Sequence, residues 1–129
     1  MEKQYLVVVD KEKNRLYIDL YNIDTEQSDQ IIDEIFAKAQ QLKAGWGCIV
    51  NYTKVDILLS KEILEKAETA MSFLKQLGMG QLARVFTEEQ SSYADELKQR
   101  SMKVGRYEGI GVRTVQDADA IFDIFRIKA

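Results

Sequence analysis

Histidine is absent from the 129-residue sequence. Without an imidazole, the Ser-His and Cys-His nucleophile pairs, histidine general bases and histidine-ligated zinc sites are excluded. The single cysteine, Cys48, can form neither an internal disulfide nor a Cys-x-x-Cys pair, which is typical of a protein in a reducing compartment. Any metal site would depend on oxygen ligands, and we expect no metal and no cofactor.

Proline is also absent, and no stretch approaches the ~18 consecutive apolar residues of a membrane span. No stretch resembles a linker, and the N-terminus lacks the pattern of a secretory signal. Eighteen basic residues face 21 acidic ones, and the net charge of −3 is too small for bulk attraction to nucleic acid or to an anionic membrane. The sequence therefore predicts one domain over residues 1–129 with a hydrophobic core of its own.

Apolar patterns predict the elements of the first half of the chain. A β-branched run at residues 5–9, a polar turn at 10–14 and an alternating segment at 16–21 predict a β-hairpin, with Asp10 as a turn residue. Apolar residues at helical spacing then predict a helix over residues 25–43. Cys48 opens the next strand, which we expect to be buried, where the thiol pKa is raised and a nucleophilic role is not expected.

The second half of the chain continues the alternation of strands and helices. The predicted elements are a helix over residues 60–78, a strand at 81–86, a helix that starts at Thr87 with Gln90 as a capping box and carries Tyr93, Ala94 and Leu97, a strand at 110–115 and a helix at 117–127. The apolar pattern is most continuous in residues 60–78 and 81–86, which predicts the buried centre there. Alternating strands and helices imply right-handed crossovers. The predicted fold class is therefore α/β: an open mixed, mostly parallel sheet of about five strands with an N-terminal β-hairpin and four helices.

Loops at the carboxyl ends of the strands are the usual ligand sites of open α/β sheets, and here they are residues 51–59, 87–90 and 114–116. A phosphoacceptor receiver domain needs an aspartate at the end of the central strand, where this sequence has Asn51. No glycine lies between a strand and a helix N-terminus, as a phosphate-binding loop requires. The sequence therefore supports neither a receiver nor a nucleotide site.

Charge is segregated along the chain. Residues 24–36 carry five acids and no base, whereas residues 98–113 carry five bases against a single acid. Arg100, Lys103 and Arg106 are candidates for an anion-binding patch, and dispersal of these bases over several faces is the favoured alternative. In the closing helix, Asp119 and Asp123 are i, i+4 neighbours that indicate a solvated helix face.

Two groups of apolar residues fall outside the helical stripes. At 100° per residue, Ile124 and Ile127 lie about 120° and 180° from Ala118, so one sheet face cannot bury all the apolar residues of the closing helix. The loop at 51–59 adds Val55, Ile57, Leu58 and Leu59. Exposed apolar patches usually mark contact sites, so we predict a partner or ligand surface at these six residues, with a homodimer as one form. The alternative is that the loop folds inward.

The hairpin, the first helix and the segments GCIVNYTKVDILLSKEILEKAETAMSFLKQLG and MGQLARVF together resemble the STAS superfamily of anti-sigma-factor antagonists, and more closely its SpoIIAA-like branch of small bacterial proteins. The resemblance lies in element order, apolar pattern and strand-loop-helix spacing. In that family a serine at a helix N-terminus is a phosphorylation switch, and the resemblance places Ser60 on it. Leu59 replaces the family's aspartate, and Lys61 and Glu62 replace its small residues, so an N-cap role for Ser60 is favoured over regulation.

The resemblance implies a non-enzymatic regulatory or protein-interaction module in the cytoplasm, with a protein as the expected partner and no nucleic acid. The residues agree, since they form no recognisable catalytic set. Two alternatives stay open: binding or carriage of a small hydrophobic or anionic ligand, and a carboxylate-based enzyme, for example around Asp56 and Lys54.

Overall fold

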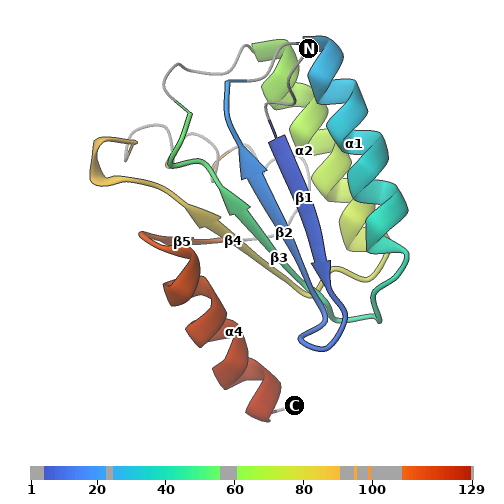
Figure 1. Ribbon diagram of the computed structural model, residues 1–129, viewed down its shortest axis with the longest axis vertical. Helices are drawn as coiled ribbons and strands as arrows, with labels where there is room; N and C mark the ends of the chain where they lie inside the picture. The colour runs from blue at the N-terminus through green and yellow to red at the C-terminus, as the bar shows by residue number, and fades with distance from the viewer. Residues whose placement is uncertain are drawn as a thin grey trace.

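Five strands form one sheet in the computed structural model, which describes residues 5–22, 25–55, 61–90, 95, 99 and 109–128. The strands are β1 (Tyr5–Asp10), β2 (Arg15–Leu20), β3 (Gly47–Asn51), β4 (Gln81–Val85) and β5 (Ile110–Val112), and they lie side by side in chain order (Figure 1). β1 pairs antiparallel with β2, and every later neighbour pairs parallel. The predicted mixed, mostly parallel α/β sheet with an N-terminal hairpin is therefore confirmed.

The helices cover both faces of this sheet. α1 (Thr25–Ala39) and α2 (Lys61–Gln76) pack together on one face, and α4 (Val115–Lys128) lies on the other (Figure 1). α1 connects β2 to β3 and α2 connects β3 to β4, so both crossovers move in the same direction across the sheet, and right-handed crossovers of this kind place their helices on the same face. α4 follows the last strand and connects no two strands, so this rule does not apply to it. The described residues contain these three α-helices, a short 3₁₀ turn, η1 (Glu88–Gln90), and two single helical residues, Asp95 and Gln99, so they do not show four complete helices. Tyr93, Ala94 and Leu97 of the predicted third helix lie outside the described residues.

A polar turn joins β1 to β2. The Asp10 carboxylate accepts a hydrogen bond from the Lys13 backbone N–H at 3.0 Å, as expected of a turn residue, and Asn14 adopts a left-handed φ of 58° that asparagine tolerates. The Asn14 side chain also exchanges two hydrogen bonds with the Lys43 backbone, at 2.9 and 3.1 Å. The helix ends at Ala39 and not at the predicted residue 43: the Gln41 and Leu42 N–H groups donate to the carbonyls three residues earlier, and the Lys43 N–H binds Asn14.

α2 ends in a Schellman motif. The Met79 N–H donates to the Leu74 carbonyl and the Gly78 N–H to the Lys75 carbonyl, both at 3.1 Å. Gly78 has a φ of 106°, a conformation that L side chains rarely adopt. Leu77, which the predicted apolar stripe included, therefore lies at the helix cap with 46% of its surface exposed.

Two apolar cores flank the sheet. The larger lies under α1 and α2, where Leu74 and Cys48 are fully buried, and the smaller joins Ile49 of β3 to Ala118 and Phe122 of α4. The predicted buried centre in α2 and β4 is confirmed at Leu74 and along β4. Burial raises the pKa of the Cys48 thiol to about 12, in agreement with the expected inert cysteine.

The boundary between β5 and α4 differs from the prediction. Val115 belongs to the helix and not to the strand, because the Thr114 hydroxyl accepts the Asp117 N–H at 3.1 Å and so caps α4, which begins two residues earlier than predicted.

Candidate docking surfaces

The carboxyl ends of β3 and β4, where the sequence predicted a ligand site, are tied together by the side chain of Gln90. Its Oε1 accepts the Thr87 N–H at 2.9 Å, which is the predicted capping-box contact. Its Nε2 donates to the carbonyls of Tyr52 and Val55 at 3.0 and 3.1 Å. In the described part of this edge, the polar groups of Gln90 therefore serve to hold two loops together.

The same contacts correct one predicted surface residue. Val55 is 8% exposed and packs in the larger core, so its assignment to an exposed patch is wrong. The loop turns inward there because the Val55 N–H donates to the Tyr52 carbonyl at 2.9 Å while Gln90 holds the Val55 carbonyl. Ile124, in contrast, is 54% exposed on α4.

The other predicted site residues cannot be placed. The structure leaves undescribed Ile57, Leu58, Leu59, Ser60, Arg100, Lys103 and Arg106, together with the side chain of Ile127. Their predicted roles stay predictions.

A groove between α1 and α2 has a volume of about 440 Å³. Its lining residues lie at i, i+3 and i+7 on α1 and at i, i+3, i+4, i+7, i+8 and i+11 on α2, so they form one stripe along each helix. They are Asp29, Ile32, Phe36, Glu62, Glu65, Lys66, Thr69, Ala70 and Phe73. Residue 29 lies beside 66, and 36 beside 73, so the two helices run in the same direction and the groove follows both.

One end of the groove is aromatic. The rings of Phe36 and Phe73 meet edge to face, with centroids 6.3 Å apart. Phe73 nevertheless keeps 51% of its surface exposed, and Leu77 lies one turn further along the chain with 46% exposed. Large apolar side chains that remain exposed next to one another are typical of a contact surface.

The other end of the groove is acidic. Lys66 Nζ lies 2.9 Å from Asp29 Oδ1 and 3.9 Å from Glu62 Oε1, and both acids are more than 60% exposed. Glu65 also lines this end, so the described lining side chains there comprise three carboxylates and one ammonium group. The acids at residues 24–36 were a signal in the sequence. Their position in the same groove as Phe73 was not, because it depends on how α1 packs on α2.

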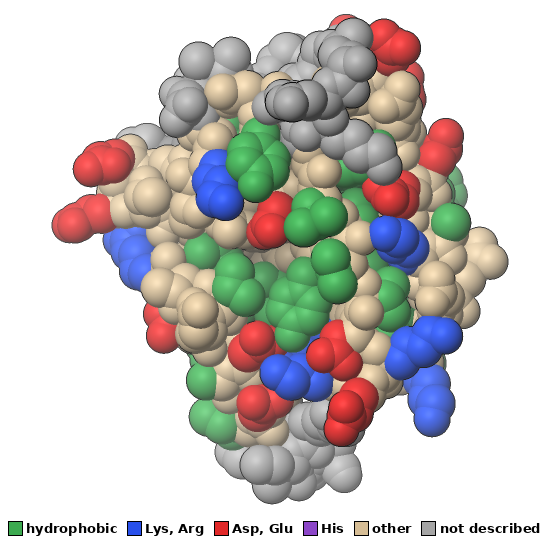
Figure 2. All heavy atoms as spheres, in the orientation of Figure 1, with side chains coloured by type: hydrophobic (Ala, Val, Ile, Leu, Met, Phe, Trp, Pro, Cys, Tyr) green, Lys and Arg blue, Asp and Glu red, His purple; other side chains and the backbone are tan. Residues whose placement is uncertain are grey.

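A second apolar surface lies on the other face of the sheet. Figure 2 shows hydrophobic side chains gathered over β1 and β2, with acidic and basic side chains beside them. Leu6 and Val8 of the edge strand β1 are 53% and 44% exposed. Lys38 donates to the Val7 carbonyl at 2.5 Å, and a lysine at this position opposes the addition of another strand to β1.

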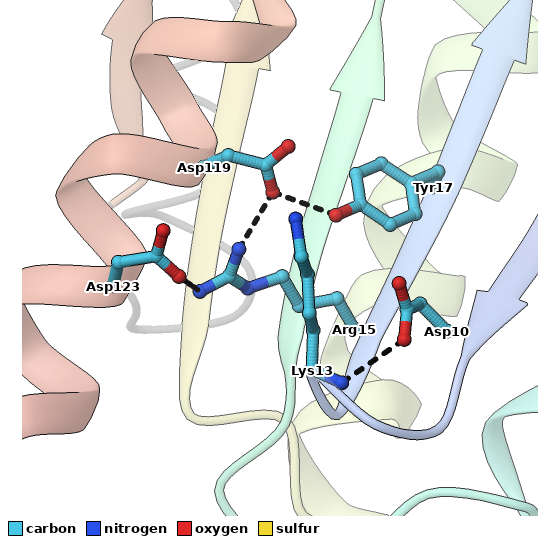
Figure 3. Close-up of polar contacts among 6 residues, drawn as sticks. All are labelled: Asp10, Lys13, Arg15, Tyr17, Asp119 and Asp123. Carbon is cyan, nitrogen blue, oxygen red and sulfur yellow. Dashed lines mark hydrogen bonds and ion pairs between the residues drawn. The ribbon is translucent and has the colours of Figure 1, made fainter.

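Beside that surface, a cluster of charged groups fastens α4 to the sheet (Figure 3). The Arg15 guanidinium, 2% exposed, donates to Asp119 at 2.7 Å and to Asp123 at 2.5 Å, and the Tyr17 hydroxyl donates to Asp119 at 2.6 Å. Burial and the hydrogen bond to Asp119 raise the pKa of Tyr17 to about 12. The interpretation of the two aspartates as a solvated helix face is therefore wrong, because both bind an arginine that is more than 100 residues away in the chain.

Gly47 allows α4 to approach this closely. A Cβ atom on Gly47 would lie 2.7 Å from the ring of Phe122, closer than real Cβ contacts. The Arg15 guanidinium lies 5.6 Å from the centroid of the same ring. The cluster therefore attaches α4 to the sheet. The sequence analysis did not identify Arg15 as a residue of this kind.

Among the residues that the structure describes, no three His, Cys, Asp or Glu side chains come together as metal ligands. No helix in the described ranges is both long and apolar enough to cross a membrane. No protein-family model matches the sequence, and no curated protein matches it either.

Proposed function

We propose that this protein is a non-enzymatic interaction module that binds a partner protein in the groove between α1 and α2. The exposed ring of Phe73 carries the proposal. Full burial of a phenylalanine contributes roughly 1.5–3 kcal/mol, so a ring that is half exposed gives up about half of that stabilisation in the free protein. A partner that covers Phe73 would recover it.

The resemblance to the STAS superfamily supports the same class of function. The chain has an N-terminal hairpin followed by alternating parallel strands and helices, and the strand-loop-helix unit of the resemblance corresponds to β3 and α2. Proteins of that family act in the cytoplasm through protein partners, which is the role we propose here.

A small hydrophobic ligand is the second candidate for the groove. Its volume of about 440 Å³ lies within the 300–1,000 Å³ that is usual for ligand pockets. Anionic ligands are disfavoured there, since the carboxylates at one end would repel them. The carboxylate-enzyme alternative depends on Asp56 and Lys54. Asp56 lies outside the described residues, and the Lys54 ammonium group lies over the Tyr21 ring, 5.2 Å from the ring centroid.

Site-specific cross-linking tests the proposal. A photo-reactive amino acid replaces Phe73 in one variant and Ile110 of β5 in a control, since both residues are apolar and exposed. In the native cells we expect a discrete adduct from position 73 that is absent at position 110. Thr69→Arg, which places a bulky side chain in the groove, should abolish the adduct. An adduct twice the mass of the chain would identify the partner as a second copy, and no adduct above the control would contradict the proposal.

Regulation at Ser60 is a separate question, because this residue immediately precedes α2 and lies outside the described residues. We expect Ser60→Ala to lower the free energy of unfolding by ~0.5–2 kcal/mol through loss of an N-cap, and Ser60→Asp to retain most of it because aspartate also caps. Urea unfolding of the three proteins measures this. Mass spectrometry of the protein purified from its native cells measures the fraction that is phosphorylated at Ser60. A large fraction phosphorylated at Ser60, with partners exchanged on dephosphorylation, would restore the family switch.

A further inference from the structure

Resting on the proposed docking function, we infer that the segment bound in the groove is an amphipathic helix with apolar anchor residues at one end and basic residues at the other. The shape of the groove, the chemistry of its two ends and the charge along its length each restrict the occupant.

The shape fits a helix of about three turns. The lining residues of α2 extend from Glu62 to Phe73, which corresponds to about 16 Å at 1.5 Å per residue. Both walls are helices, whose backbone groups bond internally, so the groove offers no strand edge with which an extended peptide could pair. Side chains at positions i, i+3, i+4 and i+7 of a bound helix would instead fit between the two stripes.

The aromatic end specifies the anchors. Phe73 and Phe36 form an edge-to-face pair, and Ile32 and Ala70 line the groove beside them. These four side chains present carbon surface, so a leucine, methionine or phenylalanine of the partner would be desolvated there without leaving a polar group unpaired.

The acidic end specifies the charge. Lys66 neutralises part of the rim, and Glu62 lies in the first turn of α2, where the helix dipole stabilises an anion. Asp29 on α1 is 63% exposed and Glu62 on α2 is 64% exposed, so together with Asp33 the described acids at this end outnumber Lys66. Asp33 is exposed nearby on α1, which has no basic residue between positions 25 and 36. Lysine or arginine on the partner would meet this surface with complementary charge.

The same charges disfavour a symmetric dimer through the groove. In a two-fold dimer the acidic end of one groove would meet either the acidic or the aromatic end of the other, and neither end is basic. A different polypeptide with basic residues supplies the complementary charge.

Two synthetic peptides of about 18 residues test the inference, a length that gives a helix of about 27 Å, which extends past both ends of the groove. Both carry leucines at i, i+3, i+4 and i+7 near one end. One has four lysines near the other end, and its partner has four glutamates in their place. Fluorescence anisotropy with the full chain measures the Kd of each peptide at low and at physiological salt.

We expect the lysine peptide to bind at least about tenfold more tightly at low salt, with a difference that shrinks as salt screens the rim. Phe73→Ser should weaken its binding by at least about tenfold, as for an interface anchor. The control Ile110→Ser, at an exposed apolar residue of β5, should leave Kd unchanged. Replacing both Asp29 and Glu65 by lysine should reverse the preference between the peptides. All these residues are exposed, and a thermal melt of each variant establishes that it is folded.

Other outcomes separate this inference from the proposed function. Equal affinity for the two peptides, or lysine-peptide binding that Phe73→Ser does not change, overturns the basic-helix inference. Preference for the glutamate peptide with sensitivity to Phe73→Ser overturns it too, but leaves the groove as a docking site. Binding of neither peptide overturns the inference, and the cross-linking result at position 73 then decides whether the docking function fails with it. A mass that doubles in sedimentation and returns to the monomer with Phe73→Ser assigns the groove to a second copy.

Discussion

The two faces of the sheet hold their helices by different means. α1 and α2 cover a large apolar core, in which aliphatic side chains from β1, β2, β3 and β4 meet those of both helices. α4 covers a small core of Ile49, Ala83, Val85, Ala118 and Phe122. The polar cluster around Arg15 completes its attachment. The first two helices are therefore positioned mainly by buried area, and α4 by one aromatic ring and a few directional bonds.

This difference places the groove on the more firmly packed side of the molecule. The residues of α1 and α2 that face the sheet are buried, while Phe73 and the acidic rim lie on the stripes between the helices. A binding site on rigid elements keeps its shape before the partner arrives, which lowers the entropic cost of binding.

The larger core is tested by Leu74→Ala, for which we expect the largest effect, a loss of ~2–5 kcal/mol in the free energy of unfolding. Leu74 is fully buried, so its removal leaves a cavity beneath α2. Urea unfolding followed by circular dichroism measures the loss. Phe73→Ala is the matched control on the same helix, and we expect it to cost less because that ring is half exposed. A thermal melt unchanged by Leu74→Ala would mean that this face of α2 is solvated.

The close approach of α4 is tested by Gly47→Ala. The new Cβ would meet the Phe122 ring at 2.7 Å, and overpacking of this kind costs ~1–3 kcal/mol. Phe122→Leu should relieve part of the clash, so a double-mutant cycle should show a favourable coupling between the two substitutions. Additive effects would indicate that Gly47 is needed for its backbone and not for the helix contact.

The ion pairs between Arg15 and α4 are tested by Arg15→Met. This variant keeps an unbranched apolar side chain but leaves Asp119 and Asp123 without the guanidinium group. Breaking a fully buried pair costs ~3–5 kcal/mol, and the exposure of Asp123 reduces our expectation to about 1–2 kcal/mol. Lys13→Met, at an exposed position of the hairpin turn, is the control and should have little effect. A stabilised Arg15→Met protein would show that apolar packing alone suffices on this face.

Alkaline pH gives the smallest expected effect and acts on the same face. The pKa of Tyr17 rises from 10.0 to about 12 in the folded protein, so its unfolded form releases the proton first. The stabilisation that this higher pKa gives to the folded protein is present in full below pH 10 and is lost as the pH rises toward 12. Unfolding measured across this range should show a shallower decline for Tyr17→Phe than for the unchanged protein. Parallel declines would mean that Tyr17 titrates normally.

Local patterns were sufficient for much of the fold. The hairpin, the alternating order of strands and helices, the buried Cys48 and the Gln90 capping box all follow from residues that are close in the chain, where periodicity and capping act directly. Element ends were less predictable. The first helix ends four residues before the predicted Lys43, whose backbone N–H instead binds Asn14, 29 residues earlier in the chain.

The sequence by itself therefore determined the secondary structure, the predominantly parallel sheet and the absence of histidine chemistry, since these depend on composition and on short-range spacing. Tertiary structure decided the rest. The pairing of Arg15 with Asp119 spans 104 residues, and that of Lys66 with Asp29 spans 37. The inward turn at Val55 depended on a glutamine 35 residues later. The groove beside Phe73 exists because two amphipathic helices, each with a predictable inner face, pack at an angle and depth that buried area sets and local sequence does not encode.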